Sequence, residues 1–161
     1  MAAMTRAATT VIDLDYRAYS WRDDADTQAT YLAACEQAEI IVGNDEEFDM
    51  LAPDHGLDWA RQAATRGKTI IYKMGSKGSI AMTPETQIET GIFDVNVLKP
   101  FGAGDAFMGG MIACLAKATP LHVAIEFGSA CAAIVVSSLS CASAMPTTQQ
   151  TQEFIAAHQK A

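Results

Sequence analysis

The sequence predicts an α/β fold, a Rossmann-like three-layer sandwich in which helices cover both faces of a mostly parallel sheet. Short, continuous apolar runs alternate with segments of helical periodicity, which is the pattern of buried parallel strands joined by helices. The chain has 161 residues, of which 50% are hydrophobic, so it has the side chains for a substantial core. Because we find no linker or internal repeat, we expect residues 1–161 to form one domain or part of one.

In the first half of the chain, β-branched runs predict strands, and apolar residues at helical spacing predict helices. The second strand follows directly on the first helix, and Asn44 is placed to cap a short helix after that strand. The predicted elements are a strand at Thr9–Leu14, a helix at Asp26–Ala38, a strand at Glu39–Gly43, the short helix after Asn44 and a helix at Leu57–Arg66.

The second half opens with a strand, a glycine-containing turn and a returning strand. A β-rich segment follows, and Pro100 ends it before a helix that begins in a glycine-rich turn. Pro120 starts a long helix, and an amphipathic helix closes the chain. The predicted bounds are Thr69–Met74, Gly75–Gly78 and Ser79–Met82 for the hairpin, then Gln87–Leu98, Gly104–Lys117, Pro120–Leu139 and Thr148–Gln159.

Charge and cysteine patterns exclude several classes of protein. The 11 Lys and Arg against 19 Asp and Glu give a net charge of −8, and the basic residues are scattered, which argues against a nucleic-acid partner. The four cysteines lie far apart without a C-x-x-C pair, so we expect reduced thiols and no zinc site. Phe127–Met145 is uncharged, but its serines favour a buried helix over a membrane span. Since the N-terminus lacks a secretory pattern, we expect a cytoplasmic protein.

The most informative segment lies at the predicted start of the Gly104–Lys117 helix. Gly102 and Gly104 flank Ala103, so consecutive backbone N–H groups can turn toward one point, as an anionic phosphoryl group requires. Asp105, in the first helical turn, could accept a proton from an attacking hydroxyl group. The alternative is a tight loop in which Asp105 only complements the helix dipole. Neither a Walker A loop nor a complete dinucleotide-binding motif is present.

The run Gly102-Ala103-Gly104-Asp105 resembles the D-T-x-G-A-G-D signature of the PfkB/ribokinase family of carbohydrate kinases, with Lys99-Pro100 in place of Asp-Thr. The resemblance implies a ribokinase-like fold, of which this chain is similar to the C-terminal half. It also implies that Asp105 is the catalytic base and contacts the acceptor substrate. Gly102, Ala103 and Gly104 would then donate their amides to the phosphoryl group in transfer.

Further segments are similar to motifs of the same family. Asn44-Asp-Glu-Glu47 matches its N-x-x-E motif, in which Asn44 and Glu47 help to hold Mg²⁺; a plain helix cap is the alternative. Gly75, Lys77 and Gly78 resemble its nucleotide loop, although the same residues suit a bare hairpin turn.

Two other assignments rest on the same resemblance. Gly128 and Cys131 are small residues that in relatives leave room for adenine, but small residues also serve close helix packing. Arg17 resembles a sugar-acid clamp, with a surface arginine as the alternative. All the loops concerned follow predicted strands or open a helix, and we expect them at one rim of the sheet.

The resemblance implies an ATP-dependent kinase with ATP and Mg²⁺ as cofactors and, as in some relatives, a monovalent cation. Its partners would be a small sugar acid and ATP, with no membrane and no nucleic acid; a homo-oligomer is left open. The similar segments Asp13–Trp21, Ile41–Met50, Tyr72–Gly78 and Leu98–Met108 favour the inositol-catabolism branch. From the resemblance we expect this chain to lack the N-terminal sugar-binding and lid portion of such kinases. Alternatives are a kinase for 2-keto-3-deoxygluconate, fructose or a nucleoside, and a non-catalytic nucleotide-binding fragment.

Overall fold

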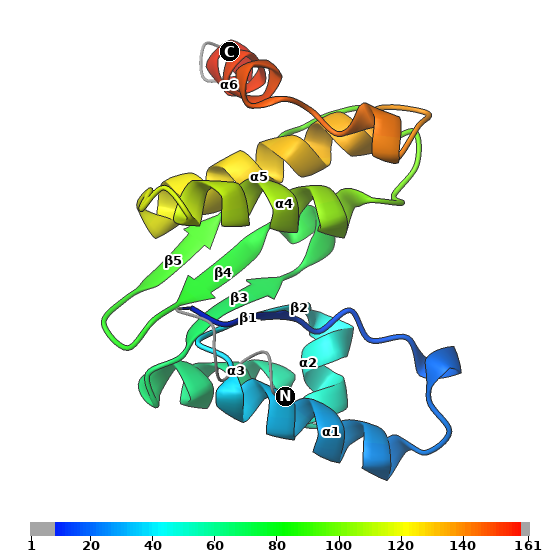
Figure 1. Cartoon of the computed structure of the whole chain (residues 1–161), viewed down its shortest axis with the longest axis vertical. Coiled ribbons are helices and arrows are strands. Elements are labelled where there is room, and N and C mark those ends of the chain that lie inside the picture. Colours follow the sequence, from blue (N-terminus) through cyan, green and yellow to red (C-terminus); the bar gives the residue numbers. More distant parts are fainter. Residues whose placement is uncertain (1–8, 159–161) are drawn as a thin grey trace. The chain divides into compact units, whose positions relative to one another are not determined.

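The structure is a computed structural model that describes residues 9–158 (Figure 1). The chain divides into two compact units, Met1–Glu89 and Thr90–Ala161. Within the described residues, no helix is long and apolar enough to cross a membrane. All four cysteines are free; Cys35 and Cys131 are buried, as expected of core thiols, whereas Cys114 and Cys141 are only half-buried.

The first unit is built on a sheet whose strands follow chain order from one edge to the other. The first three strands are parallel, in the register Val11↔Ile40 and Ile40↔Thr69, whereas the fourth returns antiparallel to the third. The sheet is therefore mixed, and its parallel part is limited to three of its five strands. The strands are β1 (Val11–Asp13), β2 (Ile40–Asn44), β3 (Thr69–Lys73), β4 (Ser79–Met82) and β5 (Gln87–Thr90).

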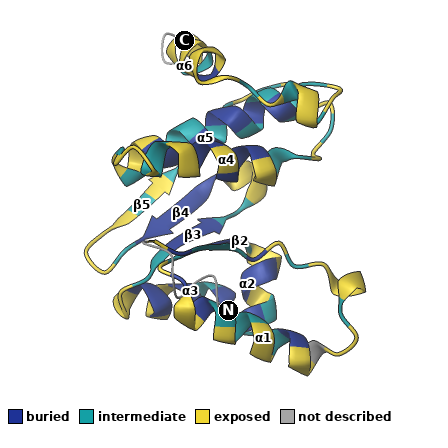
Figure 2. Cartoon of the chain, viewed as in Figure 1, coloured by how far each residue is buried: buried dark blue, intermediate teal, exposed yellow. Residues whose placement is uncertain are grey.

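Three helices of the first unit pack on one face of this sheet: α1 (Asp24–Gln37), α2 (Asp45–Leu51) and α3 (Gly56–Thr65). Residues of the strands and of the three helices form one buried apolar cluster between them. Figure 2 shows the buried residues of this unit in dark blue on its strands and helices. The outward faces of the helices are exposed. Buried members of the core include Cys35, Ile41, Phe48, Leu51, Ala60, Ile70, Tyr72 and Ile80.

The start of α1 differs from the predicted start at Asp26. The side chain of Asp23 accepts hydrogen bonds from two backbone N–H groups of the first turn, so the helix begins at Asp24. The predicted hairpin is confirmed, with Gly75–Lys77 forming a short 3₁₀ turn between β3 and β4. A second 3₁₀ turn, Ala18–Ser20, follows β1.

The second unit consists of α4 (Ala103–Leu115), α5 (Leu121–Val136) and α6 (Thr148–His158), with a 3₁₀ turn at Ala142–Ala144. Helices α4 and α5 approach closely because small residues lie between them. A Cβ atom on Gly128 would lie 2.7 Å from the carbonyl oxygen of Phe107, and one on Gly110 would lie 2.8 Å from the sulfur of Cys131. These two glycines set the spacing of the helix pair.

Two predicted bounds in this half are wrong. The β-rich segment Gln87–Leu98 forms a strand only to Thr90, because the residues after it turn to other partners. The ring of Phe93 lies 5.2 Å from that of Phe154 in α6, and the backbone N–H of Leu98 donates to the carbonyl oxygen of Val136. The long helix ends at Val136 instead of Leu139, because the Ser137 hydroxyl donates to backbone carbonyls of the last turn.

Candidate functional site

The glycine-containing turn that the sequence predicts to bind phosphate is formed in the second unit, and its contact with phosphate stays a prediction. Gly102 adopts φ +84°, the left-handed conformation that favours glycine, and α4 begins at the next residue. The Ala103 N–H donates to the carbonyl oxygen of Pro100 at 3.4 Å, and the Ala106 N–H donates to that of Gly102 at 3.0 Å. Gly104 and Asp105 lie between these two residues in the chain. Their backbone amides are among those that a helix start leaves without intrahelical acceptors. They can donate to an external anion.

Asp105 lies in the first turn of α4, and its side chain is exposed. Among residues 9–158 it takes part in no hydrogen bond or ion pair. Its carboxylate is therefore available to an external proton donor, as a general base must be. An Asp105 buried among apolar side chains would have contradicted the predicted role.

A second group of polar residues lies in the first unit, at the carboxyl ends of the parallel strands. Asp13 ends β1, Asn44 ends β2 and Lys73 ends β3. The Lys73 Nζ lies 3.4 Å from Oδ1 of Asp13, which links the two outer strands of the three. Parallel α/β sheets bind ligands at this edge. Asp13 and Lys73 were not predicted as site residues, although each lies one residue before the end of a predicted strand.

Asn44 and Glu47 form a reciprocal capping box at the start of α2. The Asn44 Oδ1 accepts from the Glu47 N–H at 2.8 Å, and the Glu47 Oε2 accepts from the Asn44 N–H at 2.7 Å. The helix cap that the sequence offered as the alternative is therefore present. It does not exclude a ligand role, because Oε1 of Glu47 is outside the box and only 4% of the residue is exposed.

Arg17 reaches the same group of residues from the loop after β1. Its guanidinium pairs with Oδ1 of Asp15 at 2.5 Å and donates to the carbonyl oxygen of Tyr16 at 2.9 Å. It also lies 3.8 Å from Oε1 of Glu47. The structure thus brings Arg17, Asn44 and Glu47 together, as predicted, and half of the Arg17 side chain remains exposed.

Burial raises the pKa of Glu47 above the ordinary value of a glutamate. The hydrogen bond from the Asn44 backbone and the charge of Lys73 act against this rise in pKa, whereas the negative charges of Asp13 and Asp15 add to it. A carboxyl group that is buried beside two other carboxylates is stabilised by any cation that binds there.

The donor set suits a cation held mostly by water and by ligand phosphates. Among the described residues, no three His, Cys, Asp or Glu side chains are grouped as metal ligands. Glu47 offers one carboxylate oxygen outside the capping box, beside the Asp13 and Asp15 charges. Mg²⁺ typically takes one or two protein carboxylates and keeps several waters, so these residues fit it better than a cation that needs a full protein cage.

The β3–β4 turn has the predicted shape. Gly75 and Gly78 both adopt positive φ, +56° and +86°, and the Met74 N–H donates to the carbonyl oxygen of Gly78 at 2.8 Å. Lys77 is exposed at the tip. The structure supports the hairpin, and the nucleotide contact of Gly75, Lys77 and Gly78 stays a prediction.

Gly128 and Cys131 are used in helix packing. Both are buried, and the Cys131 sulfur lies 3.4 Å from the hydroxyl oxygen of Thr151 in α6. Burial raises the pKa of the Cys131 thiol. The close-packing alternative is therefore present in the structure, and the predicted contact with adenine stays a prediction.

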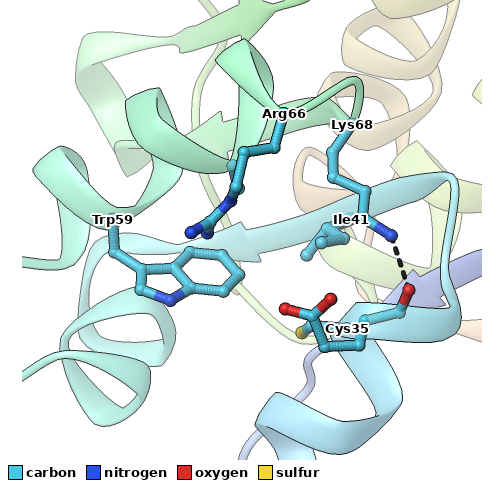
Figure 3. Close-up of a pocket in the computed structure, with 7 residues that line it drawn as sticks. Cys35, Ile41, Trp59, Arg66 and Lys68 are labelled. Carbon is cyan, nitrogen blue, oxygen red and sulfur yellow. Dashed lines mark hydrogen bonds between the residues drawn. The ribbon is translucent and has the colours of Figure 1, made fainter.

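A cavity of about 210 Å³ lies elsewhere in the first unit, between α1 and α3 (Figure 3). Trp59, Arg66 and Lys68 point into it, with Ile41 behind them. The Lys68 Nζ donates to the carbonyl oxygens of Glu36 and Ala38, at 2.7 Å each, and so caps the end of α1. None of the predicted site residues lines this cavity, and it stands at the opposite ends of the strands from Asn44 and Lys73.

Comparisons with known proteins cover most of this chain. The model of the pfkB family of carbohydrate kinases matches residues 1–148. A 5-dehydro-2-deoxygluconokinase from Geobacillus kaustophilus is 40% identical over 164 residues, which cover 97% of this chain and 49% of that protein. One from Photobacterium profundum is 42% identical over 153 residues, covering 90% and 46%. The chain thus spans about half the length of the curated relatives it matches.

Solved structures with a similar fold cover the chain almost completely. An aminoimidazole riboside kinase from Salmonella enterica, complexed with aminoimidazole riboside and an ATP analog, is 26% identical with a TM-score of 0.83, over 94% of this chain and 54% of that one. A putative ribokinase II from E. coli is 22% identical with a TM-score of 0.85, over 98% and 53%. This likeness confirms the ribokinase-like α/β fold predicted from the sequence.

Proposed function

Because this chain belongs to the pfkB family of carbohydrate kinases, we propose that it forms the phosphate-binding and catalytic-base half of an ATP-dependent sugar-acid kinase. The observation that carries the proposal is the start of α4. A left-handed Gly102 turns the chain so that first-turn amides are free to donate, and an exposed Asp105 without a partner among the described residues stands in that same turn.

The mechanism follows from these groups. The free amides where the Gly102–Gly104 turn enters α4, those of Gly104 and Asp105, hold the transferring phosphoryl group by charge-assisted hydrogen bonds, which strengthen as negative charge develops on its oxygens. Asp105 accepts the proton of the acceptor hydroxyl as its oxygen attacks phosphorus in line with the leaving ADP. Positioning supplies most of the rate increase, and no covalent intermediate with the protein is required.

Asn44 and Glu47 would hold Mg²⁺ on the side of the triphosphate, with the cation neutralising phosphate charge when it is bound. The buried Glu47, beside Asp13 and Asp15, supports this assignment. Gly75, Lys77 and Gly78 would contact the nucleotide, because the two positive-φ glycines let a ligand approach the backbone of the turn.

We propose 5-dehydro-2-deoxy-D-gluconate as the acceptor, phosphorylated on its 6-hydroxyl group. The names of the two relatives at 40% and 42% identity support this acceptor. Arg17 supports it chemically, since half of its side chain is exposed and a guanidinium can bind a carboxylate with two parallel hydrogen bonds. Kinases for 2-keto-3-deoxygluconate, fructose or a nucleoside are the alternatives.

The test compares Asp105→Asn with the matched control Asp94→Asn, another exposed aspartate of the second unit. Both are made in this chain and in a chimera in which the first half of the Geobacillus kaustophilus relative precedes it. Phosphorylation of the four candidate acceptors is followed by ³¹P NMR, and binding of ATP·Mg²⁺ by calorimetry. Asp105→Asn is expected to lower turnover about 10²- to 10⁴-fold with nearly unchanged ATP affinity.

Three other results of these experiments would change the proposal. Ordinary turnover in Asp105→Asn would remove this residue from the base role. Binding of ATP·Mg²⁺ without phosphorylation of any acceptor, in the chain and the chimera alike, would favour a non-catalytic nucleotide-binding module. Preference for another acceptor by the chimera would keep the kinase and replace its substrate.

A further inference from the structure

A side-chain hydrogen bond joins Lys99 to Cys141 beside the Gly102–Gly104 turn. The Lys99 Nζ donates to the Cys141 Sγ at 3.0 Å, and the Cys141 thiol lies 3.6 Å from the carbonyl oxygen of Phe101, to which it donates. The two residues are 42 positions apart, so the link joins the segment that enters α4 to the loop that follows α5. Neither motif spacing nor periodicity indicates this pairing.

The link is in contact with the turn itself. A Cβ atom on Gly102 would lie 3.6 Å from Cβ and 3.7 Å from Sγ of Cys141, and 3.4 Å from a methyl group of Val135. The Lys99 backbone N–H donates to the carbonyl oxygen of Val136 at 3.2 Å. The residues before and within the turn are thus fixed against the end of α5 and the loop after it.

The ammonium group of Lys99 has no ionic partner among the described residues. Lys99 is half-buried, and its ammonium group donates to a neutral thiol instead of a carboxylate. The chain carries a net charge of −8, so acidic partners are plentiful elsewhere. A half-buried cation without a counter-ion favours an anion nearby, and the first-turn amides of α4 stand only a few residues along the chain.

We propose that Lys99, acting through Cys141, is a positioning residue that orders the Gly102–Gly104 turn and favours the binding of a nucleotide phosphate on it. This inference rests on the proposed function for the identity of the anion. The ordering of the turn is a property of the ligand-free chain. The two parts can therefore be measured separately.

The first experiment measures backbone amide hydrogen exchange across residues 101–105 in the ligand-free 161-residue chain. In Lys99→Met we expect exchange there to be about fivefold to tenfold faster, the effect of losing one hydrogen bond from a locally ordered segment. Lys117→Met, an exposed lysine just after α4, is the matched control and should leave this exchange unchanged. Circular dichroism checks that each variant is folded.

Substitutions of Cys141 distinguish the loss of its hydrogen bond with Lys99 from a general loss of packing around the turn. Cys141→Ala removes the acceptor and should increase exchange as Lys99→Met does, whereas Cys141→Ser keeps a polar atom and should restore most of the protection. Because the two residues act through one contact, the Lys99→Met/Cys141→Ala double variant should exchange no faster than either single variant. Additive effects would overturn the coupling.

The second experiment measures the affinity for ATP·Mg²⁺ by calorimetry. We expect Lys99→Met to weaken binding about fivefold to tenfold and Lys99→Arg, which retains the charge, to weaken it less. Unchanged exchange in Lys99→Met overturns the inference whatever the nucleotide does. If the unsubstituted chain does not bind ATP·Mg²⁺ while Lys99→Met still exchanges faster, the ordering role stands and the proposed function fails.

Discussion

The packing of α4 on α5 can be tested with a pair of glycine-to-alanine substitutions. Gly128 and Gly109 both lie inside helices, so the change to alanine gains the same helix propensity at each, about 1 kcal/mol. Their surroundings differ. A Cβ on Gly128 would lie 2.7 Å from the Phe107 carbonyl oxygen and 3.4 Å from Cβ of Met111, whereas a Cβ on Gly109 has no other atom within 4 Å.

The propensity gain cancels between the two variants, which leaves the cost of inserting one methyl group against backbone. Overpacking of this kind costs about 1–3 kcal/mol. Gly128→Ala is therefore expected to have a free energy of unfolding about 1–3 kcal/mol below that of Gly109→Ala, which itself should exceed the unsubstituted chain. For a chain of this length the melting temperatures should differ by roughly 2–4 °C per kcal/mol.

Urea unfolding followed by far-ultraviolet circular dichroism measures both free energies, with the slope against urea concentration as a check that the denatured states are comparable. If Gly128→Ala were as stable as Gly109→Ala, the helices would not be in contact at this point and the reasoning would be refuted. A stable Gly128→Ala that bound ATP·Mg²⁺ weakly would instead favour the adenine contact predicted from the sequence.

Three further predictions concern the first unit. Burial raises the pKa of Glu47 in the folded state, so the ionised side chain costs stability above its unfolded pKa; Glu47→Gln should melt higher than the unsubstituted chain at pH 7.5, and this gap should shrink toward pH 4.5 in calorimetric scans. A gap independent of pH would contradict the assignment. Asn44→Ala should lower the free energy of unfolding by about 1 kcal/mol, while Asn44→Asp, which retains the acceptor, should not. Burial raises the pKa of Cys35 to about 12, so iodoacetamide at pH 8 should alkylate the half-exposed Cys141 well before Cys35, as peptide mass spectrometry can determine. Equal rates would mean that α1 opens readily.

Much of the fold could be predicted because local signals agreed with the tertiary structure. The apolar run at Thr69–Met74 forms β3 within one residue, and the glycines after it turn the chain back as expected. The prediction failed where a long-range partner decided the outcome. Phe93 belongs to a segment with β-forming composition, yet its ring packs on α6, and no periodicity in the segment indicates this choice.

The candidate site was predictable to a similar extent. Asn44, Glu47 and Asp105 were predicted from family-like motifs at helix starts; the structure places each of them at a helix start, and their ligand and catalytic roles stay predictions. The ion pair of Lys73 with Asp13 joins residues 60 positions apart and depends on strand order. Sequence motifs carry no such information, because a contact across the sheet exists only once the strands are paired.

The reciprocal box of Asn44 and Glu47 has a consequence for mutagenesis. The hydrogen bonds that cap the start of α2 also fix the position of the Glu47 carboxylate beside the strand ends. A substitution that breaks the cap therefore also displaces the carboxylate. Random libraries sorted for well-folded but inactive clones should therefore return few changes at these two positions apart from those that keep the cap, such as Glu47→Gln. They should return changes at Asp105 more often, because its exposed side chain forms no hydrogen bond or ion pair within residues 9–158 and its loss should cost little stability.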